Sequence, residues 1–215
     1  MPVTLRDARD SETDRDWIRT VYRDYLSELS ASKSGIFPAL GEWNAREGEF
    51  LAGWFNYSTA NPFVILQDGQ RVGFALVSRP AAFPRRSADY RMAEFFVVGK
   101  ARRRGVGASA AALLFSRFSG DWEVVEDEYN RPALGFWRRV IGQQTGGRYT
   151  EARCAGEVLH RFRALGRQPA APANRIRLII PTSLCAGQIA RMIAEKLDAK
   201  RPAAESRYGA LPHTE

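Results

Sequence analysis

The sequence predicts an α+β fold in which a mixed, mostly antiparallel β-sheet is flanked by helices. Short aromatic and β-branched segments such as "EFFVV", residues 94–98, are typical of buried strands. They alternate with segments whose apolar residues recur at spacings of three and four, which is typical of amphipathic helices. The expected order of elements over about residues 3–165 is β-α-α-β-β-β-α-β-α-β-β.

The first elements are expected to be an edge strand and two helices. The strand is "VTLRDA", residues 3–8, and Ser11 can cap the helix that follows, with Asp14 placed as in a capping box. A shorter helix is expected near residues 50–55, where apolar residues again share one face. The first helix carries an apolar stripe made of Trp17, Ile18, Val21, Tyr22, Tyr25, Leu26 and Leu29.

A hairpin and a central strand follow. The strand segments at residues 63–67 and 71–78 flank Asp68 and Gly69, a dipeptide that favours a tight hairpin turn. The next strand is expected at residues 90–98, "YRMAEFFVV".

The remaining elements are two helices and three strands. A helix is expected over residues 107–118, followed by a strand at residues 122–126. Asn130 can cap the next helix, which has Pro132 in its first turn and Gly142 as its end signal. A final antiparallel pair is expected at residues 148–153 and 157–163.

The composition argues against several classes of protein. The net charge of +8 is dispersed, and only four of the 32 basic residues are lysine, so we interpret it as arginine-rich composition and do not expect nucleic-acid binding. No apolar run approaches the roughly 18 residues of a membrane helix, and the N-terminus has no signal-peptide core. We therefore expect a cytoplasmic protein.

Two cysteines, Cys154 and Cys185, and two histidines, His160 and His213, lack metal-ligand spacing, so we expect no metal site.

The segment between the central strand and the next helix, "GKARRRGVG" at residues 99–107, predicts an anion site. Glycines let the backbone turn sharply and approach a ligand closely. The first turn of a helix offers unpaired N–H groups and the positive end of the helix dipole. Three consecutive arginines add forked donors with fixed charge. The P-loop spacing is absent, so a phosphate or pyrophosphate held in another way is expected.

Residues 102–107, "RRRGVG", read as [QR]-x-x-G-x-[GA] and resemble the acetyl-CoA pyrophosphate loop of the GCN5-related N-acetyltransferases (GNAT). A second stretch, "NRPALGFWRRVIG" at residues 130–142, resembles the family's N-x-x-A-x-x-F-Y-x-x-x-G-F segment. The resemblance covers about residues 3–165 and implies a GNAT-like fold with acetyl-CoA as co-substrate. It implies an N-acetyltransferase acting on a primary amine of an unidentified small-molecule or protein acceptor.

The resemblance also implies roles for particular residues. The main chain of Phe96, Val97 and Val98 would pair with the pantetheine arm and polarise the thioester carbonyl if the neighbouring strand splays away. Asn130 would contact the same arm, and Trp137 would pack either against that arm or in the core. The pyrophosphate would be held by Arg102, Arg103, Arg104, Gly105, Val106, Gly107, Ala108 and the hydroxyl of Ser109.

Glu94 is the candidate general base, because it precedes the most apolar strand segment and its phenylalanine neighbours would raise its pKa by desolvation. Alternatively, Glu94 is a solvent-facing residue paired with Arg85 or Arg86. Trp137 stands where the family usually has a tyrosine acid, and an indole cannot replace that acid. A catalytically weak acyl-CoA-binding sensor or interaction module is therefore the alternative function.

A domain boundary is expected near residue 165. Residues 1–165 would form the GNAT-like domain, and residues 166–215 an extension that starts with a linker, "LGRQPAAPANR" from residue 165. The extension could contain a strand and a helix before a disordered end, and we assign it no function. A homodimer is possible. The segments at residues 34–55 and 78–91 are expected to form an aromatic and basic acceptor pocket suited to small amines that carry a carboxylate.

Overall fold

The computed structural model of the chain describes residues 2–31, 47–79, 88–154 and 156–165. The C-terminal extension, from residue 166 on, lies outside the described residues. So do residues 32–46 and 80–87, which make up much of the expected acceptor pocket and include Arg85 and Arg86.

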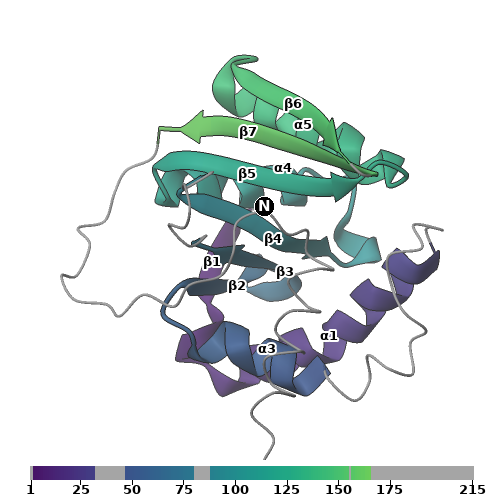
Figure 1. Ribbon diagram of the computed structural model, residues 1–215. Coiled ribbons are helices and arrows are strands. Elements are labelled where there is room, and N and C mark those ends of the chain that lie inside the picture. Colours follow the sequence, from purple (N-terminus) through teal and green to yellow (C-terminus); the bar gives the residue numbers. More distant parts are fainter. Residues whose placement is uncertain (1, 32–46, 80–87, 155, 166–215) are drawn as a thin grey trace, which may run out of the picture.

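The described residues form a seven-stranded sheet with the strand order β1-β2-β3-β4-β5-β7-β6 (Figure 1). Every neighbouring pair is antiparallel except β4 and β5, which are parallel. The strands are β1 Val3–Asp7, β2 Ala60–Gln67, β3 Gln70–Ser78, β4 Tyr90–Val97, β5 Gly120–Asp127, β6 Tyr149–Cys154 and β7 Glu157–Ala164. This arrangement confirms the predicted α+β class, the element order and the edge position of the first strand.

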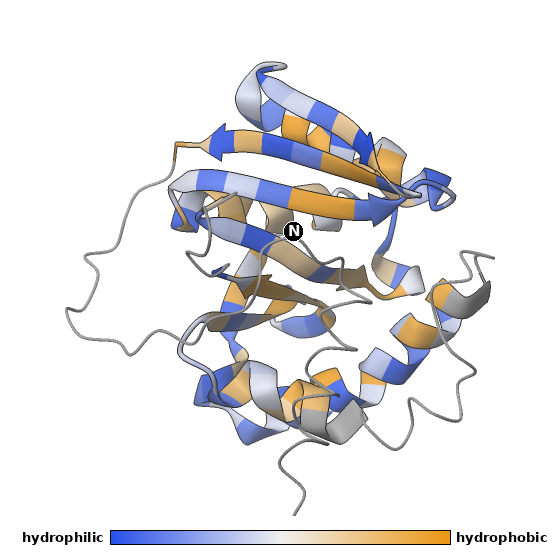
Figure 2. Ribbon diagram, in the orientation of Figure 1, coloured by the Kyte–Doolittle hydropathy of each residue, from blue (hydrophilic) through white to orange (hydrophobic). Residues whose placement is uncertain are grey.

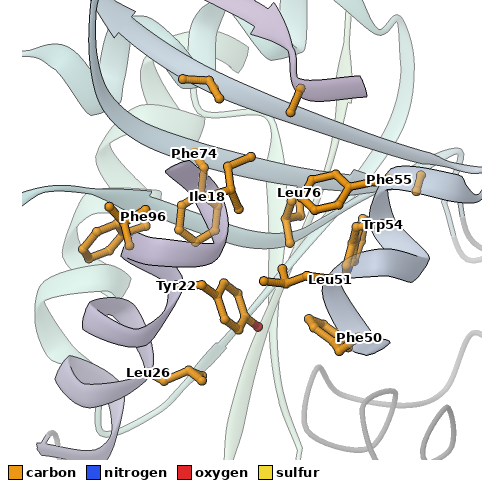
Figure 3. Close-up of a cluster of buried hydrophobic side chains, with 14 of the residues drawn as sticks. Ile18, Tyr22, Leu26, Phe50, Leu51, Trp54, Phe55, Phe74, Leu76 and Phe96 are labelled. Atoms are coloured by element: carbon orange, nitrogen blue, oxygen red, sulfur yellow. The ribbon is translucent and has the colours of Figure 1, made fainter. Parts of the chain in front are cut away.

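Helices cover both faces of the sheet (Figure 1). The helices are α1 Glu12–Ala31, α3 Glu47–Asn56, α4 Val106–Arg117 and α5 Arg131–Thr145, with short 3-10 turns at Ala8–Asp10 and Gly99–Ala101. On one face, α1 and α3 pack against β2, β3 and β4 through Ile18, Tyr22, Leu51, Phe74 and Phe96 (Figure 3). We call this the α1 face.

The opposite face packs against α4 and α5, and we call it the α4–α5 face. Its core contains Phe115 of α4, Trp137 of α5 and Trp122 of β5, each of them at most 2 % exposed. The rings of Phe115 and Trp122 meet edge to face, with centroids 4.9 Å apart. Hydrophobic residues of β5 and β7 lie among hydrophilic ones (Figure 2), and along β7 buried residues alternate with less buried ones, so one side of β7 enters this core.

Local signals for turns and caps are confirmed at two places. Asp68 and Gly69 both have positive φ, 50° and 78°, which is the type I′ geometry expected of a two-residue hairpin loop. The side chain of Asn130 accepts a hydrogen bond from the N–H of Ala133 at 3.3 Å and so caps α5. The predicted end of α5 at Gly142 is wrong, because the helix continues to Thr145 and ends where Gly146 adopts a left-handed φ of 61°.

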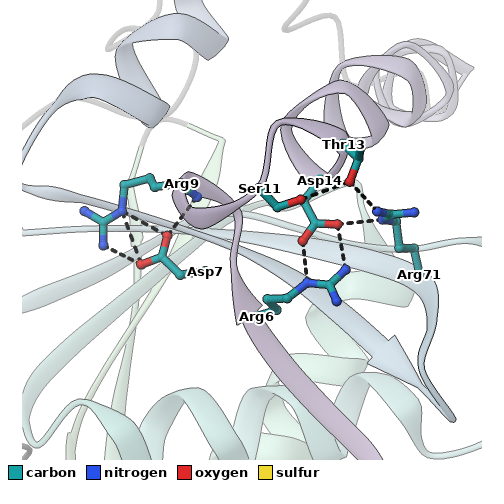
Figure 4. Close-up of polar contacts among 7 residues, drawn as sticks. All are labelled: Arg6, Asp7, Arg9, Ser11, Thr13, Asp14 and Arg71. Atoms are coloured by element: carbon teal, nitrogen blue, oxygen red, sulfur yellow. Dashed lines mark hydrogen bonds and ion pairs between the residues drawn. The ribbon is translucent and has the colours of Figure 1, made fainter.

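Asp14 has a different role from the predicted one (Figure 4). Its carboxylate is fully buried and bonds to Arg6 of β1 at 2.7 Å and to Arg71 of β3 at 2.6 Å. The Ser11 carbonyl accepts from the N–H of Arg15, which places Ser11 at the helix start as expected. Asp14 points toward the sheet, where the two arginines offer stronger bonds than a backbone N–H would. The hydrogen bond from Arg6 is the main reason that the pKa of Asp14 lies below its ordinary value.

Candidate active site

Strands β4 and β5 separate part-way along their length. They pair only where residues 90–92 of β4 lie beside residues 122–124 of β5. Beyond that point β4 continues beside β3, and β5 continues beside β7. Residues 93–97 of β4 and 125–127 of β5 therefore have no partner strand between them, and we call this pair of segments the fork. The main-chain donors predicted on β4 require the neighbouring strand to splay away, and the fork has this geometry.

A β-bulge at the start of the fork determines which way Glu94 points. Leu76 of β3 pairs with Glu94, whereas the next residue, Val77, pairs with Met92, so Ala93 is the extra residue in β4. Side chains alternate along a strand, and one extra residue reverses the alternation. Met92 accordingly packs on the α4–α5 face, while Ala93 packs against the α1-face core. The bulge thus brings Glu94 to the α1 face.

Glu94 is buried among tyrosines and phenylalanines. Its exposed fraction is 9 %, which contradicts the alternative of a solvent-facing residue. The Tyr25 hydroxyl of α1 donates to Oε2 of Glu94, and the rings of Phe74 and Phe96 each lie 5.6 Å from the Tyr25 ring. Burial raises the pKa of Glu94 to about 7, against the opposing effect of the Tyr25 hydrogen bond. A carboxylate with this pKa can exchange protons near neutral pH.

Glu126 is a second carboxylate at the fork, and the sequence analysis missed it. Its Oε1 accepts from Nε1 of Trp137 at 3.0 Å, and its Oε2 accepts from Nδ2 of Asn130 at 3.4 Å. Burial raises the pKa of Glu126 to about 7, with the Trp137 bond opposing the shift and the nearby charge of Asp127 adding to it. The sequence contains one signal for this residue. Side chains two apart on a strand lie on the same face, so Glu126 lies on the same face as the core residues Trp122 and Val124.

Trp137 and Asn130 belong to the scaffold of the fork. Trp137 is 2 % exposed, its ring lies 5.2 Å from that of Phe95 and 4.8 Å from that of Phe136, and its N–H is occupied by Glu126. Little of its surface remains for the direct cofactor contact that was predicted. Asn130 caps α5 through its oxygen and bonds to Glu126 through its nitrogen. Both residues therefore hold Glu126 in place, and the contact of Asn130 with the cofactor arm stays a prediction.

The start of α4 presents free donors beside the fork. Gly105 caps the helix in the left-handed conformation, with φ 80°, and within the described chain no side chain bonds to this cap. The first intrahelical bond runs from the N–H of Ser109 to the carbonyl of Gly105, at 3.0 Å. The N–H groups of residues 106–108 therefore have no acceptor in the helix. Arg103, Arg104 and the Ser109 side chain are exposed nearby. This combination suits a phosphate or pyrophosphate.

Three residues of the predicted loop contribute differently from one another. The side chain of Val106 is buried, so this residue can offer only its main chain to a ligand. A Cβ placed on Gly105 would meet nothing within 4 Å, which leaves open space in front of the helix start. A Cβ on Gly107 would come within 3.2 Å of the Phe136 ring. Gly107 is therefore needed for the close packing of α4 on α5, and Ala108 beside it is half-buried.

The side chain of Arg102, a predicted pyrophosphate ligand, has partners within the protein. Its Nε donates to the carbonyl of Val97 at 2.6 Å, and its Nη2 bonds to Glu28 of α1 at 2.6 Å. Its guanidinium also lies over the Phe96 ring, 5.2 Å from the centroid. Arg102 therefore ties the fork edge of β4 to α1, and a contact of its side chain with pyrophosphate would compete with these bonds.

The fork edge of β4 presents other main-chain groups than expected. The N–H of Val98 donates to the carbonyl of Val72 at 2.9 Å, so it is not a free donor. Residues two apart on a strand direct their N–H groups to the same edge, which turns Phe96 toward β3 as well. Phe95 and Val97 direct theirs into the fork, and the Arg102 bond to the Val97 carbonyl agrees with this. Of the three predicted main-chain donors, Val97 remains.

Comparison with solved structures identifies similar folds. An acetyltransferase from Thermus thermophilus matches with a TM-score of 0.55 at 14 % identity, over 76 % of this chain and 97 % of that one. A GNAT-family acetyltransferase from Bacillus cereus matches with a TM-score of 0.52 at 13 % identity, over 77 % and 99 %. The chain has the GNAT acetyltransferase fold.

A third structure with the GNAT fold was solved with coenzyme A. It is the PaiA N-acetyltransferase of Thermoplasma acidophilum, with a TM-score of 0.53 at 10 % identity, over 76 % of this chain and 99 % of that one. No family model and no curated protein matches the sequence. The comparisons thus confirm the predicted fold.

Two further features of the described residues bear on the site. None of their helices is both long and apolar enough to cross a membrane. Their histidine, cysteine, aspartate and glutamate side chains form no group of three or more that could hold a metal ion.

Proposed function

We propose that the chain is an acetyl-CoA-dependent N-acetyltransferase that acetylates a primary amine of a small-molecule or protein acceptor. The observation that carries the proposal is the fork, which places an open strand edge, a helix start without a side-chain cap and a buried glutamate in one region. The shared fold with acetyltransferases, one of them solved with coenzyme A, supports it.

The residues at the fork fit the cofactor. The free N–H groups of residues 106–108 and the exposed Arg103, Arg104 and Ser109 suit its pyrophosphate. The main-chain groups of Phe95 and Val97 suit an extended amide-bearing arm. When bound, acetyl-CoA would supply the activated acyl group.

Glu94 would take the proton of the attacking amine. An unperturbed lysine-like amine has a pKa of about 10.4, so roughly one molecule in 2,500 is neutral at pH 7. A base is therefore useful, and one with a pKa of about 7 is half ionised where it must act. The bulge and Tyr25 hold Glu94 on the α1 face, from which an acceptor could approach the fork.

A second candidate function is an acyl-CoA-binding module with little or no activity. Two observations favour it. Trp137 is buried and offers no hydroxyl as an acid, and Arg102 already bonds to the Val97 carbonyl at the fork edge. A module of this kind would bind acetyl-CoA and release no thiol.

One pair of measurements separates these functions. Calorimetry with acetyl-CoA tests binding, and thiol release from acetyl-CoA with a panel of amines tests transfer. The panel should hold matched pairs with and without a carboxylate, such as tyramine and tyrosine, or cadaverine and lysine. Binding with amine-dependent thiol release supports the enzyme, and binding alone supports the module. Absence of binding contradicts both.

A further inference from the structure

We infer that Glu126 is a second catalytic carboxylate, which works as a pair with Glu94 across the fork. The inference rests on the proposed function and assigns the step that protonates the leaving sulfur. Its basis is the placement of two glutamates, Glu94 buried and Glu126 half-buried, on the two strand segments that separate at the fork.

The two carboxylates approach the fork from opposite faces of the sheet. Glu94 lies on the α1 face, where Tyr25 bonds to it. Glu126 bonds to Trp137 in the α4–α5 core, and the donor groups at the start of α4 belong to the same face. An acyl carrier held by α4 would therefore meet Glu126, while an acceptor arriving along α1 would meet Glu94. This placement assigns the acid role to Glu126 and the base role to Glu94.

Charge supports treating the two glutamates as a pair. Burial is the main cause of the raised pKa of both Glu94 and Tyr25, and the negative charge of Glu126 raises both further. Asp127 next to Glu126 adds further negative charge. The groups that bond to Glu126, the indole of Trp137 and the amide of Asn130, are uncharged, so neither neutralises it. Two like charges that interact in this way favour a state in which the pair keeps one proton.

A pair with one proton balances the proposed reaction. The amine nitrogen forms a bond to the acyl carbon, the bond from that carbon to sulfur breaks, and its electron pair goes to the sulfur. An amine that arrives as an ammonium gives its first proton to Glu94, which passes that proton to solvent. Glu94 then takes a second proton from the nitrogen as the nitrogen is acylated, and Glu126 gives one proton to the sulfur. In the transfer step one proton enters the pair and one leaves it, so the two glutamates together still hold one proton. Exchange with solvent then returns that proton from Glu94 to Glu126.

The test compares the wild type with Glu126→Gln and with a matched control, Glu128→Gln, which removes a carboxylate just beyond the fork. Calorimetry with acetyl-CoA comes first. All three proteins should bind it with similar affinity, because neither side chain holds the phosphates. Absence of binding in all three would contradict the proposed function and would not by itself concern the pair.

Carbon-13 NMR of the glutamate carboxyl carbons then tests the pair without any turnover. In the wild type, Glu94 and Glu126 should titrate in two separated steps around pH 7, because ionisation of one hinders ionisation of the other. In Glu126→Gln, Glu94 should titrate in one step at lower pH, because a neighbouring negative charge is gone. Glu128→Gln should keep both steps. An unchanged Glu94 titration in Glu126→Gln would overturn the inference.

Turnover with an amine that the panel identifies completes the test. In the wild type, kcat should rise with pH as the pair loses its first proton and fall as it loses the second. Glu126→Gln should lower kcat by about 10²-fold or more and remove the falling limb, since glutamine cannot give a proton. A uniform loss at every pH with both limbs kept, or no loss, would overturn the acid role. If no amine reacts, the NMR titration alone decides whether the pair exists.

Discussion

The indole N–H of Trp137 donates to Oε1 of Glu126 across 3.0 Å, which joins the buried side of α5 to the end of β5 that separates from β4. This bond stabilises the ionised form of Glu126, while burial disfavours that form. Trp137 therefore sets both the position and the protonation of a carboxylate at the fork, although the indole itself is no proton donor for the reaction.

Replacing Trp137 by Phe should raise the pKa of Glu126 above about 7, because burial would remain and an opposing hydrogen bond would be lost. The smaller ring would also leave a cavity and should lower the free energy of unfolding by about 1–3 kcal/mol. Carbon-13 NMR titration and denaturant unfolding measure the two effects. A pKa of Glu126 that stays unchanged would show that the indole bond does not control its protonation.

Replacing Glu94 by Gln should cost most activity above pH 7 and least below pH 6. The pKa of Glu94 is about 7, so the wild type loses its ionised base as pH falls and approaches the variant there. At high pH the loss should be about 10²–10⁴-fold, the usual contribution of a positioned base. The ratio of the two kcat values between pH 5.5 and 8.5 checks this. A ratio that is constant with pH would mean that Glu94 is not the base.

Tyr25→Phe should move the rising limb of the pH profile to higher pH. The Tyr25 hydroxyl opposes the upward pKa shift of Glu94, so its removal should raise that pKa further. The matched comparison is Tyr57→Phe, which removes an exposed tyrosine hydroxyl of the chain segment after α3. A rising limb at the same pH in Tyr25→Phe and the wild type would contradict the assignment.

Arg103→Gln combined with Arg104→Gln should weaken acetyl-CoA binding by about tenfold or more, because each arginine can make charge-assisted bonds to a pyrophosphate. Lys100→Gln, which removes a nearby exposed charge, is the control and should have little effect. Arg102→Gln should also bind acetyl-CoA normally, since Arg102 bonds to Val97 and Glu28. Calorimetry measures all three, and equal affinity in the double variant and the wild type would exclude Arg103 and Arg104 as ligands.

Asp14→Asn should lower the free energy of unfolding by about 3 kcal/mol, because it leaves Arg6 and Arg71 without their buried partner. The pKa of Asp14 lies below its ordinary value of 3.8 in the folded protein. Its stabilising effect is therefore complete above that value and is lost as pH falls through the lower, folded pKa. Denaturant unfolding at pH 7 and below pH 4 checks both statements. Equal stability of Asp14→Asn and wild type at pH 7 would contradict them.

Features that depend on a few neighbouring residues could be predicted from the sequence. The type I′ turn at Asp68 and Gly69 and the Asn130 cap each arise from backbone preferences of one or two residues. The apolar periodicity was sufficient for the element order. The end of α5 was missed because glycine is tolerated inside a helix, and only the left-handed conformation at Gly146 ends it.

Features that depend on distant residues could not be predicted. The face of Glu94 depends on a bulge at Ala93, which pairing with β3 produces. The motif indicates a phosphate contact for Arg102, but its bonds to Val97 and Glu28 involve β4 and α1, which the motif does not contain. The strand alternation indicates that Glu126 points inward, but nothing nearby in sequence reveals Trp137 as its partner.

The central claim is that acetyl-CoA binds at the fork and the start of α4, and amide chemical shifts on addition of acetyl-CoA test it most directly. We expect the largest shifts at Phe95, Val97 and residues 106–109, with small shifts in β1 and β6 at the sheet edges. Absence of saturable shifts, or shifts concentrated away from the fork and the start of α4, would contradict the account.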